Sequence, residues 1–165
     1  MYEQGFTIIE LMITLAIAAI IISFAAPSFK EAIDNNRVSS RVNDFIASLA
    51  LAKSEAVKRN ASAQIVPTAG GSDWSDGYKI GIDLNGNNLF DDIVGGVAEK
   101  TLKIIEAPKS GTTINSTMTK IEYNSFGGIT DAGTFEFDAN YACKRTITLS
   151  SSGVNSISKE SQPCY

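Results

Sequence analysis

Glu10 is the residue whose position in this sequence most needs a chemical explanation. It is the only charged residue between Phe6 and Ala26, in a run whose other members are apolar or carry hydroxyls. A carboxylate inside such a helix costs on the order of 2.5 to 3.5 kcal/mol in a membrane, so a partner or a function must compensate it. If the chain were cut after Gly5, the new amino group of Phe6 would lie one helical turn from Glu10 of its own or a neighbouring chain. We therefore expect these two groups to pair.

The composition removes most enzymatic chemistries. The 165 residues include no histidine, so the commonest general base and the commonest transition-metal ligand are missing. Triad hydrolases and His-ligated zinc sites are thereby excluded. Asp73, Ser75 and Asp76 form no arrangement of base, nucleophile or phosphate loop. We expect neither an enzyme nor a bound cofactor.

Side chains that carry oxygen gather in one segment and could bind calcium, a hard cation that takes six to eight oxygens. They are Asp83, Asn85, Asn87, Asp91 and Asp92. Read as an EF-hand loop, the sixth position is Asn88 instead of Gly and the twelfth is Val94 instead of Glu. Because Asn and Asp also favour tight turns, a solvated hairpin turn is the preferred interpretation.

A small basic patch is the candidate for binding nucleic acid. Lys144 and Arg145 lie beside Cys143, and Lys159 follows near the C-terminus. Two or three phosphate contacts give only weak, salt-sensitive binding, and the net charge of −4 gives no general attraction to polyanions. Scattered surface charges are the preferred interpretation, and we do not expect nucleic acid as a partner.

One long helix, with its first half in lipid and its second half packed on a sheet, must position these groups. Residues 6–27 would form a helix of about 32 Å, enough to cross a bilayer core of about 30 Å, with a weak point at Pro27. Residues 28–60 place apolar side chains three and four apart, which predicts an amphipathic helix. Ser28 and Glu31 are suited to cap its start, and Asn60 to end it. The apolar positions are Phe29, Ile33, Val42, Phe45, Ile46, Leu49, Ala52, Ala56 and Val57.

From residue 61 onward, short β-branched runs broken by Gly, Asn, Asp and Pro predict strands and turns. An α+β fold follows, in which one antiparallel sheet or two small sheets cradle the second half of the helix. Trp74 and Tyr78 are expected in its core. The expected strands are Ala63 to Val66, Tyr78 to Asp83, Thr101 to Glu106, Lys120 to Asn124, Thr134 to Asp138, Arg145 to Ser150 and Val154 to Ser158.

The N-terminal run Gly5-Phe6-Thr7-Ile8-Ile9-Glu10-Leu11 resembles the signature of the type IV pilin superfamily. The resemblance implies a pilin fold, cleavage by a prepilin peptidase after Gly5 and methylation of Phe6. It implies that Glu10 guides the subunit into a filament and that the long helix kinks at Pro27. It divides the chain into a leader (1–5), a transmembrane and assembly helix (6–27), an amphipathic helix (28–60) and a β-rich head (61–165).

A second run of residues narrows the resemblance to one group within the superfamily. Residues 47–60, which end in Lys53-Ser54-Glu55-Ala56-Val57-Lys58-Arg59-Asn60, are similar to a signature of the minor pilins and pseudopilins of the FimT, FimU and type II secretion H group. Residues 74–78 and 83–87 resemble the Trp-x-x-Gly-Trp and Asp-x-Asn strand pair of that group. DNA-uptake members carry a Gly-Arg-x-Arg element, and both arginines are absent from the nearest equivalent, residues 153–156.

The sequence contains two cysteines, Cys143 and Cys164. An even number of cysteines in a chain that we expect to be exported suggests one disulfide. Closing a loop of about 20 residues contributes roughly 3 kcal/mol. Two free thiols are the alternative.

The leader departs from the family in one respect. It carries no Lys or Arg, whereas Lys30, Arg37 and Arg41 follow the apolar run, so the positive-inside rule alone favours the reverse orientation. An ordinary signal peptide and a plain signal anchor are alternatives. A secretory signal, however, needs a basic n-region and a shorter apolar core.

The sequence therefore predicts a non-enzymatic minor type IV pilin that acts in assembly at or near a filament tip. The implied partners are other minor pilins, the major pilin, the prepilin peptidase and the inner-membrane platform protein. The head would lie in the periplasm on a single inner-membrane span until the subunit enters the filament. An H-type pseudopilin of type II secretion and a DNA-binding minor pilin of natural transformation are the alternatives, and the C-terminal disulfide favours the pilus.

Overall fold

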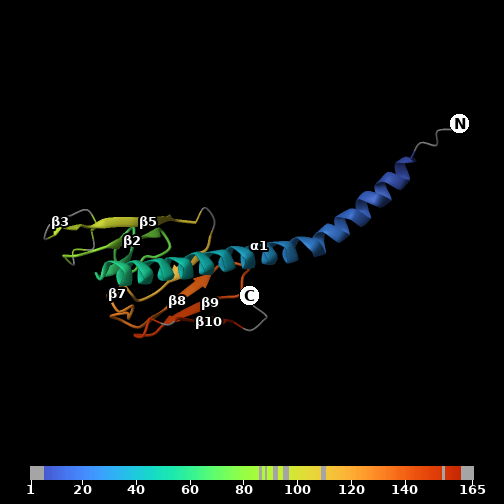
Figure 1. Cartoon of the computed structure of the whole chain (residues 1–165). Helices are drawn as coiled ribbons and strands as arrows, with labels where there is room; N and C mark the ends of the chain where they lie inside the picture. Colours follow the sequence, from blue (N-terminus) through green and yellow to red (C-terminus); the bar gives the residue numbers. More distant parts are fainter. Residues whose placement is uncertain are drawn as a thin grey trace.

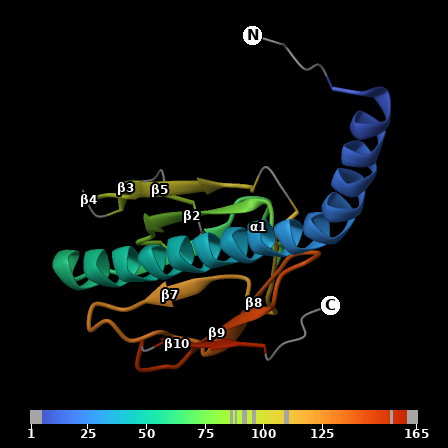
Figure 2. The ribbon, with the colours of Figure 1, turned by 90° about the vertical axis from the view of Figure 1, so that its right-hand side faces the viewer.

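One long helix, α1 (Ile8–Arg59), organises the molecule (Figure 1). The computed structural model describes residues 6–85, 87, 89–90, 93–94, 97–108, 111–153 and 155–160, with the side chains at 24–28, 93–94 and 97–98 left out. The second half of α1 packs against the β-rich head, and the first half projects away from it. Figure 2 shows the projecting half at a steep inclination to the packed half.

The ends of α1 are set by local chemistry. Thr7 has extended backbone and caps the first turn, where Glu10 completes a capping box. Asn60 adopts the left-handed conformation, with φ 50° and ψ 42°, and its N–H bonds back to the carbonyls of Ala56 and Val57. The predicted stop at Asn60 is confirmed.

The prediction of one long helix is confirmed, because α1 runs without interruption from Ile8 to Arg59. The predicted cap at Ser28 is therefore wrong. A residue inside a helix receives its backbone bonds from the preceding turn, so no orphan N–H groups remain there for a cap to satisfy. The backbone of α1 is also helical at Pro27. The side chain of Pro27 lies outside the described residues, and the kink at this position stays a prediction.

The buried face of α1 follows the predicted spacing of three and four residues. Its members are Val38, Val42, Phe45, Leu49, Ala52 and Ala56, each at most 3% exposed. Phe29 and Val57, which the pattern assigned to this stripe, are 72% and 52% exposed. Val57 follows Ala56 directly and so points about 100° away from it around the helix.

Two four-stranded antiparallel sheets lie against α1. The first has the order β5-β2-β1-β7, formed by β1 (Ala63–Pro67), β2 (Gly77–Ile82), β5 (Lys100–Glu106) and β7 (Ile121–Tyr123). The second has the order β10-β9-β8-β6, formed by β6 (Thr113–Asn115), β8 (Gly133–Asp138), β9 (Arg145–Leu149) and β10 (Asn155–Lys159). A short hairpin pairs β3 (Ile93–Val94) with β4 (Val97–Ala98).

The core is centred on Phe45 of α1. Its ring lies 4.7 to 6.1 Å, centroid to centroid, from the rings of Trp74, Tyr78, Phe135 and Phe137. Trp74 and Tyr78 are 0% and 2% exposed, which confirms the prediction that they are core residues. The Tyr78 hydroxyl lies 3.2 Å from Ser48 Oγ, and burial raises the pKa of Tyr78 to about 12.

Candidate functional site

The start of α1 holds the Glu10 side chain in a defined position. Glu10 Oε2 accepts hydrogen bonds from the Thr7 backbone N–H at 2.8 Å and from Thr7 Oγ1 at 2.9 Å. In return, Thr7 Oγ1 accepts from the Glu10 N–H at 3.3 Å. The carboxylate is therefore anchored one turn from Phe6, whose side chain is 89% exposed. Gly5, the predicted cleavage position, lies outside the described residues.

The described part of the projecting half of α1, residues 8–23, is an apolar stem without a covering layer. Its large apolar side chains are between 52% and 81% exposed and occur on every side of the helix: Ile8, Ile9, Leu11, Met12, Ile13, Leu15, Ile17, Ile20, Ile21 and Ile22. A helix that is apolar all round is normally buried in a protein core or in a membrane. The stem therefore needs an apolar environment that the monomer does not supply.

Across the part of the chain that the structure describes, no helix is both long and apolar enough to cross a membrane.

Three of the five calcium candidates lie in the loop after β2, which leads to the β3–β4 hairpin and does not itself close one. The side-chain oxygens of Asp83, Asn85 and Asn87 each accept the backbone N–H two residues onward, at 3.2, 2.9 and 2.7 Å. Such bonds are typical of Asx turns. Asp91 and Asp92 lie outside the described residues. Among the described ones, no three His, Cys, Asp or Glu side chains gather as a metal site would require.

Glu99 completes this turn and was not singled out from the sequence. Its Oε1 accepts from the backbone N–H groups of Leu84 at 2.7 Å and Asn85 at 3.1 Å. Glu99 and Asp83 are only 6% and 3% exposed. A lone Glu before a strand carries no local signal of this role, because the bonded N–H groups lie about 15 residues earlier.

The basic candidates meet at the junction of β9 and β10. Arg145 and Lys159 are direct cross-strand partners, and the Lys144 carbonyl accepts from the Glu160 N–H at 3.0 Å. Lys144 Nζ lies 3.6 Å from Glu136 Oε2. Arg145 alternates with Lys144 along the strand and shares the face of the buried Ile147, so the two side chains point to opposite faces of the sheet. The structure therefore brings the three backbones together but does not gather the three cations into one patch.

Only Cys143, one of the two residues of the predicted disulfide, lies within the described part of the chain. Cys143 is fully buried and disulfide-bonded, and its N–H donates to Asn35 Oδ1 of α1 at 3.1 Å. Cys164, its predicted partner, lies outside the described residues. The start of β9 is therefore tied to α1 by a hydrogen bond next to the disulfide.

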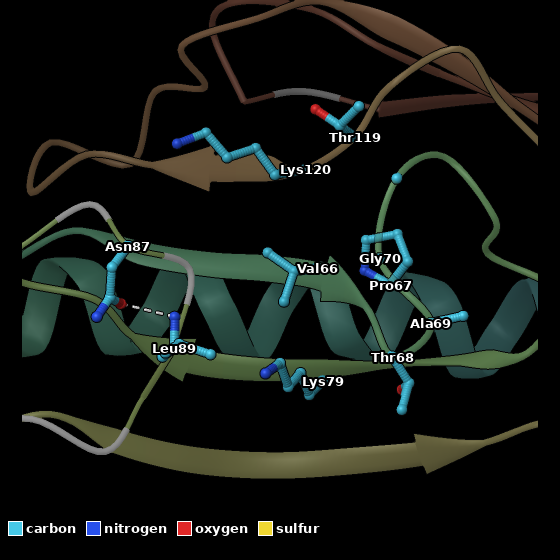
Figure 3. A pocket seen from close by; sticks show the side chains of 11 residues that line it. Val66, Pro67, Thr68, Ala69, Gly70, Lys79, Asn87, Leu89, Thr119 and Lys120 are labelled. Atoms are coloured by element: carbon cyan, nitrogen blue, oxygen red, sulfur yellow. Dashed lines mark hydrogen bonds between the residues drawn. The ribbon is translucent and has the colours of Figure 1, made fainter.

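A groove of about 400 Å³ lies on the face of the first sheet that is turned away from α1 (Figure 3). Val66 and Pro67 contribute to its floor, and Lys79 and Lys120 extend from the strands on either side of Val66. Lys79 Nζ lies 5.4 Å from the centroid of the Phe90 ring, and Lys120 Nζ lies 3.0 Å from Glu122 Oε2. Because both lysine side chains already have partners, the lining of this groove does not indicate a ligand site, and we interpret it as an ordinary surface depression.

An exposed apolar stem that continues into a helix packed on antiparallel sheets is the architecture of a type IV pilin. Residues 41–153 match the family model described as type II transport protein GspH, and residues 1–26 match the prokaryotic N-terminal methylation motif. The chain belongs to the GspH family of minor pilins and pseudopilins.

Solved structures agree with this fold. Two crystal structures of the type IV minor pilin FimU from Pseudomonas aeruginosa superpose with TM-scores of 0.58 and 0.56 at 20% identity. The alignments cover 79% and 77% of this chain and 96% and 99% of the FimU chains. The predicted α+β pilin fold and family are confirmed. No curated protein matches the chain.

Proposed function

We propose that this chain is a minor type IV pilin, a structural subunit that takes part in pilus assembly or priming at or near the filament tip. The observation that carries the proposal is the exposed stem, residues 8–23. Burying apolar side chains contributes roughly 25 cal/mol per Å², so a helix with this much apolar surface gains strongly from packing among similar helices. A bundle of pilin stems supplies that environment without any catalytic step.

The N-terminus supports the same proposal. The methylation motif spans residues 1–26 and includes Gly5, Phe6 and Glu10. In the proposed mature chain, the peptidase has removed residues 1–5 and the methylated amine of Phe6 meets Glu10 of a neighbouring subunit. Both hydrogen bonds from Thr7, one from its N–H and one from its hydroxyl, reach Oε2 of Glu10. Neither bond uses the amine of Phe6. The capping box can therefore persist while the carboxylate pairs with an amine.

The proposed location follows from the stem. Before assembly, residues 6–27 anchor the chain in the inner membrane, with the head in the periplasm. On assembly, contacts with other stems replace contacts with lipid. The proposed partners are other minor pilins, the major pilin, the platform protein and the prepilin peptidase.

The test is the intact mass of the protein purified from its native membrane, with and without reductant. The expected mass is that of residues 6–165 plus one methyl group, lighter by two hydrogen atoms before reduction. A mass that still contains residues 1–5 would overturn the proposal in favour of a plain membrane-anchored domain. Equal masses with and without reductant would contradict the proposed disulfide between Cys143 and Cys164.

The second candidate function is that of an H-type pseudopilin, and the description of the matching family model favours it. Deletion of the gene separates the two. Loss of twitching with intact exoprotein secretion supports the pilus, and the opposite pattern supports type II secretion.

A further inference from the structure

A pocket of about 230 Å³ lies beside α1, where the helix packs on both sheets, and we call it the seam pocket. Its lining comes from α1, from β7 and from the hairpin of β9 and β10, which lie below the helix in Figure 2. The turn after β7 is joined to the turn after β9, because the Ile129 N–H donates to the Ser151 carbonyl at 3.0 Å. The lining side chains include Ile46, Leu49, Ala50, Lys53, Tyr123 and Asn155.

Tyr123 contributes a buried hydroxyl group to the lining of the seam pocket. The residue is 2% exposed, and no hydrogen bond engages its hydroxyl within the part of the chain that the structure describes. Burial alone raises the pKa of Tyr123 to about 12. A buried tyrosine hydroxyl normally has a hydrogen-bond partner. An acceptor that enters the pocket would therefore supply the partner that the monomer lacks.

Lys53 brings a positive charge to the same pocket. Among the described residues, its Nζ has one polar contact, the Gly153 carbonyl at 3.4 Å, and no carboxylate lies within ion-pair distance. The side chain is held between two turns. A Cβ on Gly127 would lie 2.9 Å from Lys53 Cε, and a Cβ on Gly153 would lie 3.3 Å from Lys53 Nζ. The ammonium group is thus positioned at the pocket with a charge that an anion could balance.

The lining selects the class of ligand. Ile46 and Leu49 present apolar side chains, so part of the occupant must be apolar. Lys53 and Tyr123 offer one cation and one neutral donor, which match the single charge and the two oxygens of a carboxylate. Phosphate carries nearly two charges and would need a second cation. Cavities of about 150 Å³ hold benzene, so this pocket accommodates a carboxylate on a short apolar chain.

We propose that the seam pocket binds a carboxylate carried on a short apolar chain, supplied by an aspartate or glutamate of a neighbouring pilin. The inference rests on the proposed function, in which other pilins pack beside α1. Ala50, which lines the pocket, is exposed on the same helix that continues into the stem. Lys53 and Tyr123 bond the incoming carboxylate, and Ile46 contacts its methylene groups. One acidic side chain thereby fixes the position of the neighbouring head along α1.

The first experiment tests the chemistry of the pocket with a small probe. The full chain in non-ionic detergent is titrated with trifluorobutanoate, a carboxylate on a short apolar chain, and fluorine NMR follows binding. We expect a roughly millimolar dissociation constant, as for other ligands of this size. The neutral trifluorobutanamide should bind about tenfold more weakly, because it forms no charge-assisted bond. Equal binding of the acid and the amide, or no binding of the acid, overturns the proposal.

Two variants separate binding from folding. Lys53→Met removes the charge and keeps a long side chain, and Tyr123→Phe removes only the hydroxyl. Each should weaken the binding of trifluorobutanoate by about fivefold or more. Because the Tyr123 hydroxyl has no hydrogen bond to lose among the described residues, Tyr123→Phe should leave the thermal midpoint undiminished. Binding that survives Lys53→Met unchanged contradicts the assignment of the pocket.

A matched pair on α1 tests whether the probe occupies the pocket itself. Ala50→Leu places a larger side chain in the lining and should abolish the binding of trifluorobutanoate. Ala47 is also exposed on α1 but lies outside the lining, so Ala47→Leu should leave binding unchanged. Equal effects of the two substitutions would show that the probe binds elsewhere and would overturn the proposal.

The second experiment identifies the source of the carboxylate in the native cells. Ala47→p-benzoylphenylalanine places a photo-crosslinker one helical turn from Ala50 without entering the lining. The expected adduct is on another pilin, within a few residues of an Asp or Glu. Lys53→Glu should abolish it, and replacement of that acidic residue by Lys should restore it. If trifluorobutanoate binds but no pilin adduct forms, the ligand is a free acid and the assignment to a neighbouring pilin is wrong.

Failure of this inference and failure of the proposed function give different results. A chain that is cut after Gly5 and methylated, yet does not bind trifluorobutanoate, retains its function as a pilin and loses only the carboxylate site. A chain that keeps residues 1–5 and still binds the probe through Lys53 has the site without being a processed pilin.

Discussion

Trp74 Nε1 donates a hydrogen bond to the Met118 carbonyl at 2.6 Å, and this bond ties the segment before β2 to the segment before β7. Trp74 is fully buried, and its ring lies edge-on to Phe135, 4.9 Å between centroids. Through one side chain, the indole thus connects the segments that precede two strands of the first sheet to β8 of the second sheet.

Trp74→Phe should lower the free energy of unfolding of the full chain by about 2 to 4 kcal/mol. The change leaves a buried carbonyl without its donor and opens a cavity beside Phe135. Denaturant unfolding in detergent measures the difference. The control is Phe126→Leu, which alters an exposed aromatic and should change stability by less than about 0.5 kcal/mol. Equal losses of unfolding free energy in the two variants would show that the hydrogen bond from Trp74 to the Met118 carbonyl does not stabilise the fold.

Glu99→Ala should destabilise the turn after β2 far more than Glu106→Ala. The Glu99 carboxylate accepts two backbone N–H groups while 6% exposed, whereas Glu106 is an exposed strand residue. Hydrogen bonds to a charged acceptor contribute about 1.5 to 3 kcal/mol each, so we expect a loss of at least about 2 kcal/mol. Amide exchange at Leu84 and Asn85 gives the local readout and should accelerate only in the Glu99 variant.

The Glu122 carboxylate should make stability depend on pH in the acid range. Burial raises its pKa, but hydrogen bonds from Ser62 Oγ at 2.7 Å and Lys120 Nζ at 3.0 Å outweigh burial and leave the pKa below its ordinary value of 4.5. A carboxyl with a lowered folded pKa stabilises the protein above its unfolded pKa. That contribution is lost as the pH falls through the folded pKa.

Glu122→Gln tests this dependence. The variant should be less stable than the natural chain near pH 7, and the gap should close as the pH falls through the lowered pKa of folded Glu122. Chemical unfolding at several pH values measures the gap, with Glu106→Gln as the exposed control. A gap that stays constant with pH would mean that Glu122 acts through packing alone.

The sequence predicted the elements whose signals are local. The stripe from Val42 to Ala56 and the left-handed stop at Asn60 each depend on residues within a turn or two, and both appear in the structure. The seven predicted strands correspond to seven observed ones within one or two residues at each end, from Ala63–Pro67 to Asn155–Lys159.

The remainder depends on contacts that no local pattern encodes. β6 and the β3–β4 hairpin have two or three residues per strand, too few to show alternation. Glu99 is recognisable as a turn acceptor only after the chain returns to Leu84. The capping box of Thr7 and Glu10 does carry a local signal, because Thr7 precedes Glu10 by three residues. The expectation of an ionic partner for the lone carboxylate does not include this cap.

Replacement of either cysteine should have the same effect as replacement of both. Cys143 is disulfide-bonded, and closing a loop of about 20 residues contributes roughly 3 kcal/mol. If Cys143 and Cys164 share that bond, Cys143→Ser, Cys164→Ser and the double variant should lose similar amounts, because one bond is removed each time. Thermal unfolding in the absence of reductant measures the losses. Additive losses would show that the two residues act independently.

Glu10→Gln and Thr7→Ala separate the two chemical roles that the start of α1 allows for Glu10. Glutamine serves a capping box as well as glutamate does, so Glu10→Gln keeps the bonds to Thr7 and removes only the charge. Thr7→Ala removes the hydroxyl that bonds Oε2 and keeps the charge.

If Glu10 pairs with the amine of Phe6 on a neighbouring chain, Glu10→Gln should sharply reduce the amount of this chain in sheared filaments, and Thr7→Ala should reduce it only slightly. If the carboxylate acts only as a cap, the order of the two effects reverses. The ratio of filament to membrane protein, measured by immunoblot for both variants at equal expression, distinguishes these cases. Because the cap and the ion pair use the same side chain, only a variant that preserves the cap and removes the charge can assign the assembly role to the charge of Glu10.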